Sequence, residues 1–255
     1  MCLAFLRFDP SSAWPLLLAA VRDEDLARAS APPGPWWPER CPAAVGGRDL
    51  RSGGTWLAVD PGARALAAVF TPGAPTPVGT DLRSRGELAL AALADPALNQ
   101  VDPAAYEPFA LLRADAGTGS VLWWTWDRVA FERVQVPAGL HMANIAGLDA
   151  TRSSPRQARW VRPFASAVPD PFHPGADVRS RWRGWLDLFD GALEPQRPDA
   201  LLGRHTGAHG SYGTRSAAMV ALPAAAGELP VYDWSPTPWD LDSWSPVFPR
   251  PTAPG

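Results

Sequence analysis

The stretch CLAFLRFDPSSAWPLLLAAVRDE, residues 2–24, decides the fold of this chain. It contains two apolar runs, at 2–8 and 14–20, with the turn-forming residues DPSS at 9–12 between them. Apolar runs that flank such a cluster are typical of an antiparallel β-hairpin. In a hairpin the start of the first strand lies beside the end of the second, so we expect the charged residues at 22–24 to lie next to residue 2.

Cys2 directly follows Met1, so removal of Met1 would leave a chain that begins with a thiol beside its own free amine. The α-amino group has an ordinary pKa of about 7.7–8.0 and a cysteine thiol one of about 8.5. Such a pair suits a nucleophile and its general base near neutral pH. The structural alternative is that Cys2 is a small apolar residue that opens an edge strand.

The composition predicts one soluble domain that folds without a metal or a disulfide. Of the 255 residues 46% are hydrophobic, and the net charge is −3. The 23 basic residues are all arginine and are interspersed with acids, which gives no basic stripe of the kind that binds nucleic acid. Two cysteines favour a reducing compartment, and the apolar run 14–21 is too short to span a bilayer. We therefore expect a cytoplasmic protein without a membrane span.

Strand hairpins are predicted along much of the remaining chain. Short apolar runs bounded by turn residues predict strands. These runs lie at 56–60, 63–70, 109–113, 121–126, 128–136, 217–222 and 229–233. Residues 31–42, APPGPWWPERCP, are predicted to form a loop with two exposed tryptophans, because proline disrupts helices and central strands.

Two predicted helices interrupt the strands. A capping box from Ser84 to Glu87 precedes the apolar run 88–93, and the segment 179–189 carries apolar residues at helical spacing. Hairpins interrupted by two helices indicate an α+β layered domain, which we place at residues 1–232. The proline- and tryptophan-rich residues 233–255 are predicted to form a C-terminal tail.

Several short motifs occur in an order that resembles the NRDE family, also called the transport and Golgi organisation 2 family. They are Cys2, AAVRDE at 19–24, GGRD at 46–49, GGTWL at 53–57 and YGTRS at 212–216, with weaker matches at 84–86 and 139–144. The resemblance implies the fold of N-terminal-nucleophile hydrolases. That fold is a four-layer αββα sandwich of two antiparallel sheets flanked by helices.

The same resemblance implies roles for five residues. Cys2 is the nucleophile, Arg22 and Asp23 line the site, Asn144 is a polar donor across it, and Arg215 closes its far side. Arginines supply the positive potential that a thiolate needs, an aspartate can hold the α-ammonium, and a neutral amide can stabilise an oxyanion. The structural alternatives are an Arg22–Asp23 ion pair, a turn at Asn144, and a brace from Arg215 to a backbone carbonyl.

Four more residues are candidates for substrate binding: Glu24, Trp56, Thr71 and His141. The glycine pairs at 46–47 and 53–54 lack the context of a phosphate loop and predict tight turns that let Trp56 pack beneath the site.

Two positions depart from the family pattern. Val21 replaces the asparagine that precedes the arginine of the eponymous motif, and residues 70–71, Phe-Thr, replace a common Thr-Asn. Both changes remove an amide donor. If either donor belonged to the oxyanion hole, its loss would lower the rate about 10²- to 10³-fold.

Three functions follow from these features. The first is an N-terminal-cysteine amidohydrolase or acyl transferase that acts on a small-molecule amide or acyl bond and needs no cofactor or metal. The second is a non-catalytic binding and trafficking protein for haem or for a lipid or acyl-CoA, with His141, His205 or His209 as ligands to haem carried as cargo. The third is an inactive scaffold whose tail recruits a partner. The sequence leaves the oligomeric state open.

Overall fold

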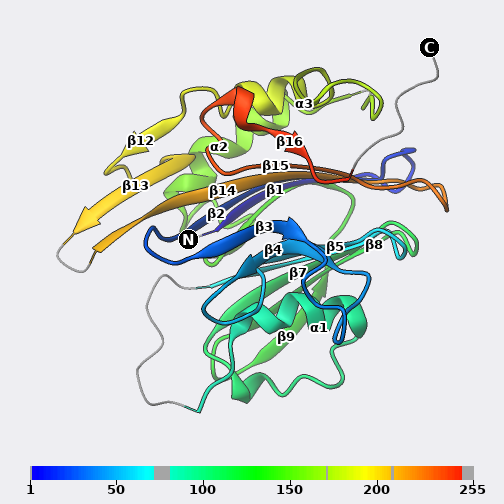
Figure 1. Cartoon of the computed structure of the whole chain (residues 1–255), viewed down its shortest axis with the longest axis vertical. Coiled ribbons are helices and arrows are strands. Elements are labelled where there is room, and N and C mark those ends of the chain that lie inside the picture. The colour runs from blue at the N-terminus through cyan, green and yellow to red at the C-terminus, as the bar shows by residue number, and fades with distance from the viewer. Residues whose placement is uncertain (1, 72–80, 171, 208–209, 249–255) are drawn as a thin grey trace.

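The computed structural model describes residues 2–71, 81–170, 172–207 and 210–248. These residues form two stacked sheets with helices on their outer faces (Figure 1). The upper sheet runs in the order β11-β10-β1-β2-β14-β13-β12, and β15 and β16 extend it from β14. Its strands are β1 (Leu3–Phe8), β2 (Leu16–Asp25), β10 (Gly139–Asn144), β11 (Gly147–Leu148), β12 (Leu193–Pro195), β13 (Leu202–Gly207), β14 (Gly210–Leu222), β15 (Val231–Ser235) and β16 (Ser245–Pro246).

The lower sheet is a meander in which each strand pairs with the next one along the chain. Its strands are β3 (Ser30–Gly34), β4 (Val45–Asp49), β5 (Leu57–Asp60), β6 (Ala65–Phe70), β7 (Phe109–Asp115), β8 (Ser120–Trp126) and β9 (Phe131–Gln135). All pairs in both sheets are antiparallel except β12 with β13.

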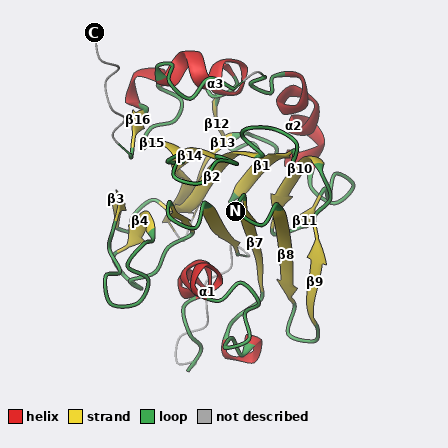
Figure 2. Cartoon of the chain, turned by 90° about the vertical axis from the view of Figure 1, so that its right-hand side faces the viewer, coloured by secondary structure: helices red, strands yellow, loops and turns green. Residues whose placement is uncertain are grey.

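The helices complete a four-layer arrangement (Figure 2). Helices α2 (Pro155–Ser166) and α3 (Val178–Asp187) cover the upper sheet, and α1 (Leu88–Ala94) lies beneath the lower sheet. Each outer layer has its own buried apolar cluster against the sheet that it covers. The predicted α+β αββα sandwich is therefore confirmed. In the described part of the chain no helix is long and apolar enough to cross a membrane.

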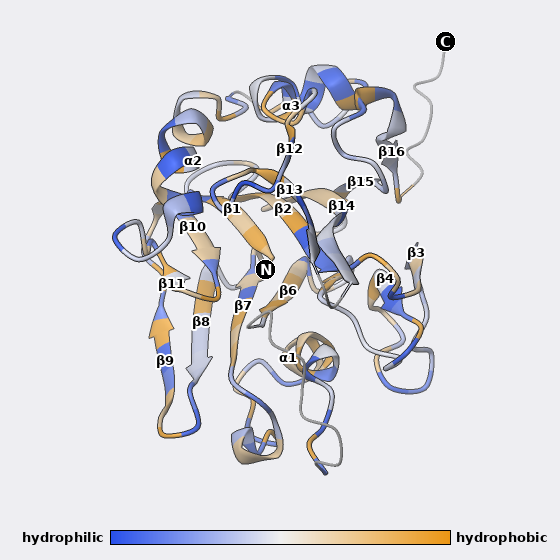
Figure 3. Ribbon diagram, turned by 90° about the vertical axis from the view of Figure 1, so that its left-hand side faces the viewer, coloured by the Kyte–Doolittle hydropathy of each residue, from blue (hydrophilic) through white to orange (hydrophobic). Residues whose placement is uncertain are grey.

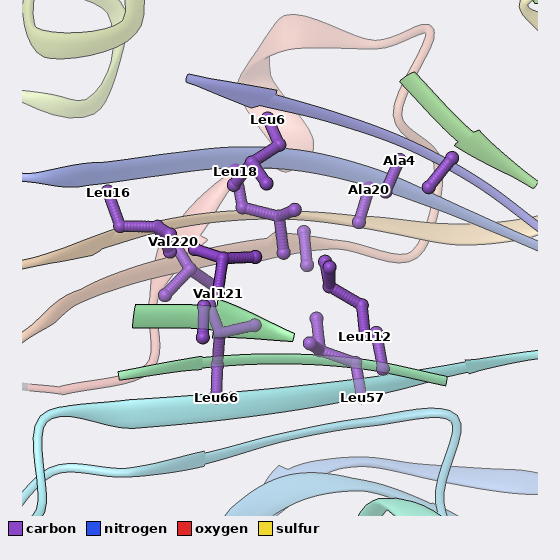
Figure 4. Packing of buried hydrophobic residues seen from close by; sticks show 14 of the residues in the cluster. Ala4, Leu6, Leu16, Leu18, Ala20, Leu57, Leu66, Leu112, Val121 and Val220 are labelled. Carbon is purple, nitrogen blue, oxygen red and sulfur yellow. The ribbon is translucent and has the colours of Figure 1, made fainter. Parts of the chain in front are cut away.

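The inner faces of the two sheets meet in a buried apolar cluster that we call the inter-sheet core. Leucine, valine and alanine side chains from β1, β2 and β14 pack there against those of β5, β6 and β7 (Figure 4). The strands that contribute to it, β1 and β6 among them, are largely apolar along their length (Figure 3). Burial of this area is the main favourable term in folding.

The predicted N-terminal hairpin is confirmed. Strands β1 and β2 pair with Leu3 opposite Val21 and Phe8 opposite Leu16. Both faces of this hairpin are buried, one in the inter-sheet core and the other against α2 and α3. We call the second cluster the helix-side core. A slip by one residue would exchange these two faces and turn the charged Arg22 toward the helix-side core, so Arg22 and the turn at residues 9–12 fix the register.

Other expectations need correction. Residues 30–34 form the edge strand β3, where proline is tolerated because a ladder hydrogen bond is not needed on the open side. Of the two tryptophans after it, Trp36 is exposed, but Trp37 is buried and donates a hydrogen bond to the Gly53 carbonyl. Helix α2 is present in addition to the two predicted helices; Ser154 caps it and Pro155 occupies its first position.

Part of the predicted tail packs on the domain. Strand β15 includes residues 233–235, the first residues of the predicted tail. Trp244 is buried in an edge-to-face contact with Phe189. Phe248 contacts the ring of Tyr232 in the same way. Residues 249–255 lie outside the described residues.

Asp233 anchors helix α3 to the upper sheet. Its carboxylate is fully buried and accepts hydrogen bonds from Arg181 Nη1 at 3.1 Å and Trp182 Nε1 at 2.6 Å. Removal of one partner from a buried ion pair leaves an uncompensated charge in the interior.

We predict that Asp233→Ala lowers the free energy of unfolding by about 3–5 kcal/mol. Asp242→Ala is the matched control, because Asp242 pairs with Arg179 of the same helix but is exposed. The control should change stability by less than about 1 kcal/mol. Denaturant unfolding measures both, and equal losses would contradict the anchoring role.

Candidate active site

A cavity of about 880 Å³ opens beside the start of β1. Its walls come from segments far apart in the sequence. They include the end of β2, the end of β4 with the loop that follows it, residues 82–86, the start of β14, and β15. Seven of the nine predicted site residues line this cavity: Cys2, Arg22, Asp23, Glu24, Trp56, Thr71 and Arg215.

The strand register places three side chains in a row toward this cavity. Leu3 pairs with Val21, and both belong to the helix-side core, so the neighbouring Cys2 and Arg22 point to the opposite face. Ser216 of β14 pairs with Arg22 and therefore shares its face. Cys2, Arg22 and Ser216 all line the cavity and are buried.

A β-bulge accounts for the position of Arg215. The register between β2 and β14 shifts between Thr214 and Ser216, so Arg215 is the extra residue. A bulge of this kind re-aims a side chain. The Arg215 guanidinium lines the cavity, and its Nη1 donates to the Leu26 carbonyl at 2.9 Å, as the predicted backbone brace would.

Arg22 and Asp23 bind different partners. Arg22 Nη2 lies 3.7 Å from Glu24 Oε2 and 3.5 Å from Asp49 Oδ2. The carboxylate of Asp23 binds Arg156 of α2 and accepts a hydrogen bond from Thr214 Oγ1 at 2.8 Å. Asp23 is thereby held in a fixed orientation at the end of β2.

The Asp23 carbonyl oxygen connects the thiol to a tyrosine. Cys2 Sγ lies 4.0 Å from this oxygen, which also accepts a hydrogen bond from the Tyr212 hydroxyl at 2.8 Å. Burial raises the pKa of Tyr212, so the hydroxyl keeps the proton that it donates. Burial likewise raises the pKa of the Cys2 thiol, while the positive charge of Arg22 acts in the opposite direction.

Asn144 does not share the cavity. It pairs with Leu3 across β10 and β1 and so points to the helix side of the sheet. Its amide nitrogen donates to Ser154 Oγ at 2.8 Å, and its oxygen accepts from the Ala146 backbone N–H at 2.8 Å. Both polar atoms are engaged in holding the turn after β10 against the start of α2.

His141 also lies outside the cavity lining. Its Nδ1 is 2.7 Å from Asp149 Oδ2 and its Nε2 is 2.9 Å from the Pro137 carbonyl. Both ring nitrogens are therefore occupied, and the hydrogen bond to Asp149 raises the pKa of His141. Of the other candidate haem ligands, His205 lines the cavity and His209 lies outside the described residues.

Val21 faces the helix-side core and is buried there. A side chain at this position points away from the sulfur of Cys2, so an amide here would not donate into the cavity. Thr71, the other departure from the family pattern, does line the cavity.

Four polar residues of this region lie outside the set that the sequence predicts: Arg156, Tyr212, Thr214 and Ser216. Arg156 comes from α2, and the sequence Ser154-Pro-Arg-Gln157 has the form of a capping box with proline at the first helical position, which could have revealed that helix. The position of Ser216 in the cavity follows from its pairing with Arg22 in the register of β2 with β14. The sequence alone does not reveal that register.

A family model described as Transport and Golgi organisation 2 matches residues 1–152. No curated protein gives a match. Among solved structures, a Caenorhabditis elegans N-acylethanolamine-hydrolyzing acid amidase (NAAA) ortholog is similar with a TM-score of 0.32 and 10% sequence identity, over 56% of this chain and 69% of that chain.

The first prediction for the site concerns the thiol. In a Cys41→Ser protein that retains Met1, the pH dependence of alkylation by iodoacetamide should give Cys2 a pKa above its ordinary value, because burial disfavours the thiolate. Arg22→Gln should raise this pKa further, since a nearby positive charge is lost. A pKa at or below that of a free cysteine would contradict this assignment.

The second prediction concerns His141. Its pKa is raised in the folded state, so its stabilising effect is fully present below the unfolded value of about 6.5 and is lost as the pH rises through the folded value. The difference in Tm between the parent and His141→Gln should therefore be largest near pH 5.5 and shrink toward pH 9. A constant difference over that range would rule out this linkage.

Proposed function

The chain belongs to the Transport and Golgi organisation 2 family, and from this premise we propose that it is an N-terminal-cysteine amidohydrolase or acyl transferase acting on a small-molecule amide. One observation carries the proposal. The sulfur of Cys2, at the start of the first strand, lies in a cavity with two arginines from distant strands, Arg22 and Arg215.

In the proposed reaction, removal of Met1 makes the amine of Cys2 the general base. The amine takes the thiol proton, the sulfur bonds to the amide carbonyl carbon, and the C–N bond breaks as the amine returns the proton to the leaving nitrogen. Water then attacks the thioester, and its proton passes through the amine to the sulfur as the C–S bond breaks. The products are a carboxylic acid and an amine, and another acceptor in place of water gives acyl transfer.

The high pKa of the buried thiol makes a base necessary in this scheme. Asp23 is positioned to hold the ammonium form of the new amine, because Arg156 and Thr214 fix its carboxylate at the end of β2. Arg22 supplies the positive potential that favours the thiolate.

In this proposal the hydroxyl of Ser216 stabilises the oxyanion. Asn144, the donor implied by the family resemblance, uses its amide nitrogen for Ser154 and faces away from Cys2. The hydroxyl of Ser216 lines the cavity in the same row as Cys2 and Arg22, and a hydroxyl can donate to a developing oxyanion. Glu24, Trp56 and Thr71 complete the walls around a substrate.

The alternative function is a non-catalytic binding and trafficking protein for haem or for a lipid or acyl-CoA. The observation that favours it is the aromatic surface of the cavity, to which Trp56, Tyr232 and Trp234 contribute. His205 is the candidate axial ligand for haem in that case, since both ring nitrogens of His141 have partners.

Intact mass after incubation with p-nitrophenyl decanoate tests the enzymatic proposal. We expect loss of Met1 and one decanoyl adduct, which Cys2→Ala abolishes and Cys41→Ala preserves. Ser216→Ala should slow acylation about 10²- to 10³-fold at unchanged Tm. Retention of Met1, or an adduct that survives Cys2→Ala, would overturn the proposed mechanism.

A further inference from the structure

The cavity carries an excess of positive charge. Seven arginines line it against four carboxylates, whereas the chain as a whole has a net charge of −3. The four carboxylates lie near some of these arginines and leave others without an ion pair. Asp49 and Glu24 lie near Arg22 and Arg28, and Asp23 binds Arg156, which does not line the cavity.

Three half-buried lining arginines, Arg48, Arg85 and Arg215, make no ion pair with a carboxylate in the described part of the chain, and the same holds for the exposed Arg51. The buried Nε of Arg48 has no hydrogen-bond partner there either. Arg85 donates from Nη1 to the Pro108 carbonyl at 3.1 Å, and Arg215 donates to the Leu26 carbonyl while its Nε is buried without a partner.

Arginines without an anionic partner are costly at such positions. Burial lowers the pKa of Arg85, which means that the protein disfavours its charge at this position. A buried guanidinium N–H without a partner also loses the hydrogen bond that it would make to water. An anion that entered the cavity would remove both costs, and the planar fork of arginine matches a carboxylate.

Part of the cavity wall is aromatic. Trp56, Tyr232 and Trp234 pack on the inter-sheet core, of which Cys2 is also a member. Cys2 therefore lies where this aromatic wall meets the arginines, beside Arg22 on the neighbouring strand. The volume of about 880 Å³ is near the upper end of the range for small-molecule sites.

We propose that the cavity selects amides with an apolar acyl chain and an anionic group on the amine side, such as N-acylated amino acids. The acyl chain lies on the aromatic wall, the scissile carbonyl lies at Cys2, and the anion binds Arg48 and Arg85. The position of the scissile bond in this assignment rests on the proposed function. The preference for an anionic ligand concerns binding alone and does not require catalysis.

Binding to the Cys2→Ala protein tests the preference without turnover. The ligands are N-dodecanoylglycine and its neutral counterpart N-dodecanoylglycinamide, followed by tryptophan fluorescence. The acid should bind at least about tenfold more tightly than the neutral amide, because a charge-assisted hydrogen bond contributes about that factor. Added KCl should weaken binding of the acid more than that of the amide.

Arg48→Gln and Arg85→Gln should each remove most of this preference and leave the affinity for the neutral amide unchanged, which also shows that the variants are folded. Arg133→Gln, on the exposed strand β9, is the control and should keep the preference. Equal affinities for the two ligands, no binding of either, or equal effects of Arg48→Gln and Arg133→Gln would overturn the proposal. Acylation of Cys2 by p-nitrophenyl decanoate, which is neutral, would still report on the enzymatic proposal in each of these cases.

Discussion

The alternation of side chains along β1 and β2 is the constraint on which the site depends. Residues 16, 18 and 20 enter the inter-sheet core, and residues 17, 19 and 21 enter the helix-side core. The two faces are both apolar and covered, but a slip by one residue would turn the charged Arg22 toward the helix-side core, so Arg22 and the turn at residues 9–12 select a single register. That register continues beyond the last apolar pair and presents Cys2 and Arg22 to the cavity. The geometry of the candidate site is thus a consequence of packing several residues away.

Local patterns in the sequence are sufficient to predict the hairpins. The turn cluster between the first two runs, and the Pro61-Gly62 turn between β5 and β6, each predicted a pair that the structure contains. The positions of Arg22, Asp23 and Glu24 beside Cys2 followed from hairpin geometry alone. Arg215 could be placed in the cavity only through the family resemblance, because the pairing of β14 with β2 joins segments nearly 200 residues apart.

The remaining site features depend on tertiary contacts that no local pattern encodes. Asn144 ends its strand at the expected place, but its pairing with Leu3 turns the side chain toward the helices. Arg156 reaches Asp23 only because α2 packs across the upper sheet. The prolines of β3 predict a loop because they are unfavourable in a central strand, whereas at the edge of the sheet they cost no ladder hydrogen bond.

The cavity combines features that oppose stability. It holds a thiol whose buried position disfavours ionisation and arginines that lack neutralising carboxylates. A chain selected for stability alone would fill this space with apolar side chains, as it does a few residues away in the inter-sheet core. The three buried clusters supply the favourable free energy that allows such a region to persist. Unfavourable local interactions within a well-packed structure are typical of functional sites, and in this cavity the charge without an ion-pair partner is positive.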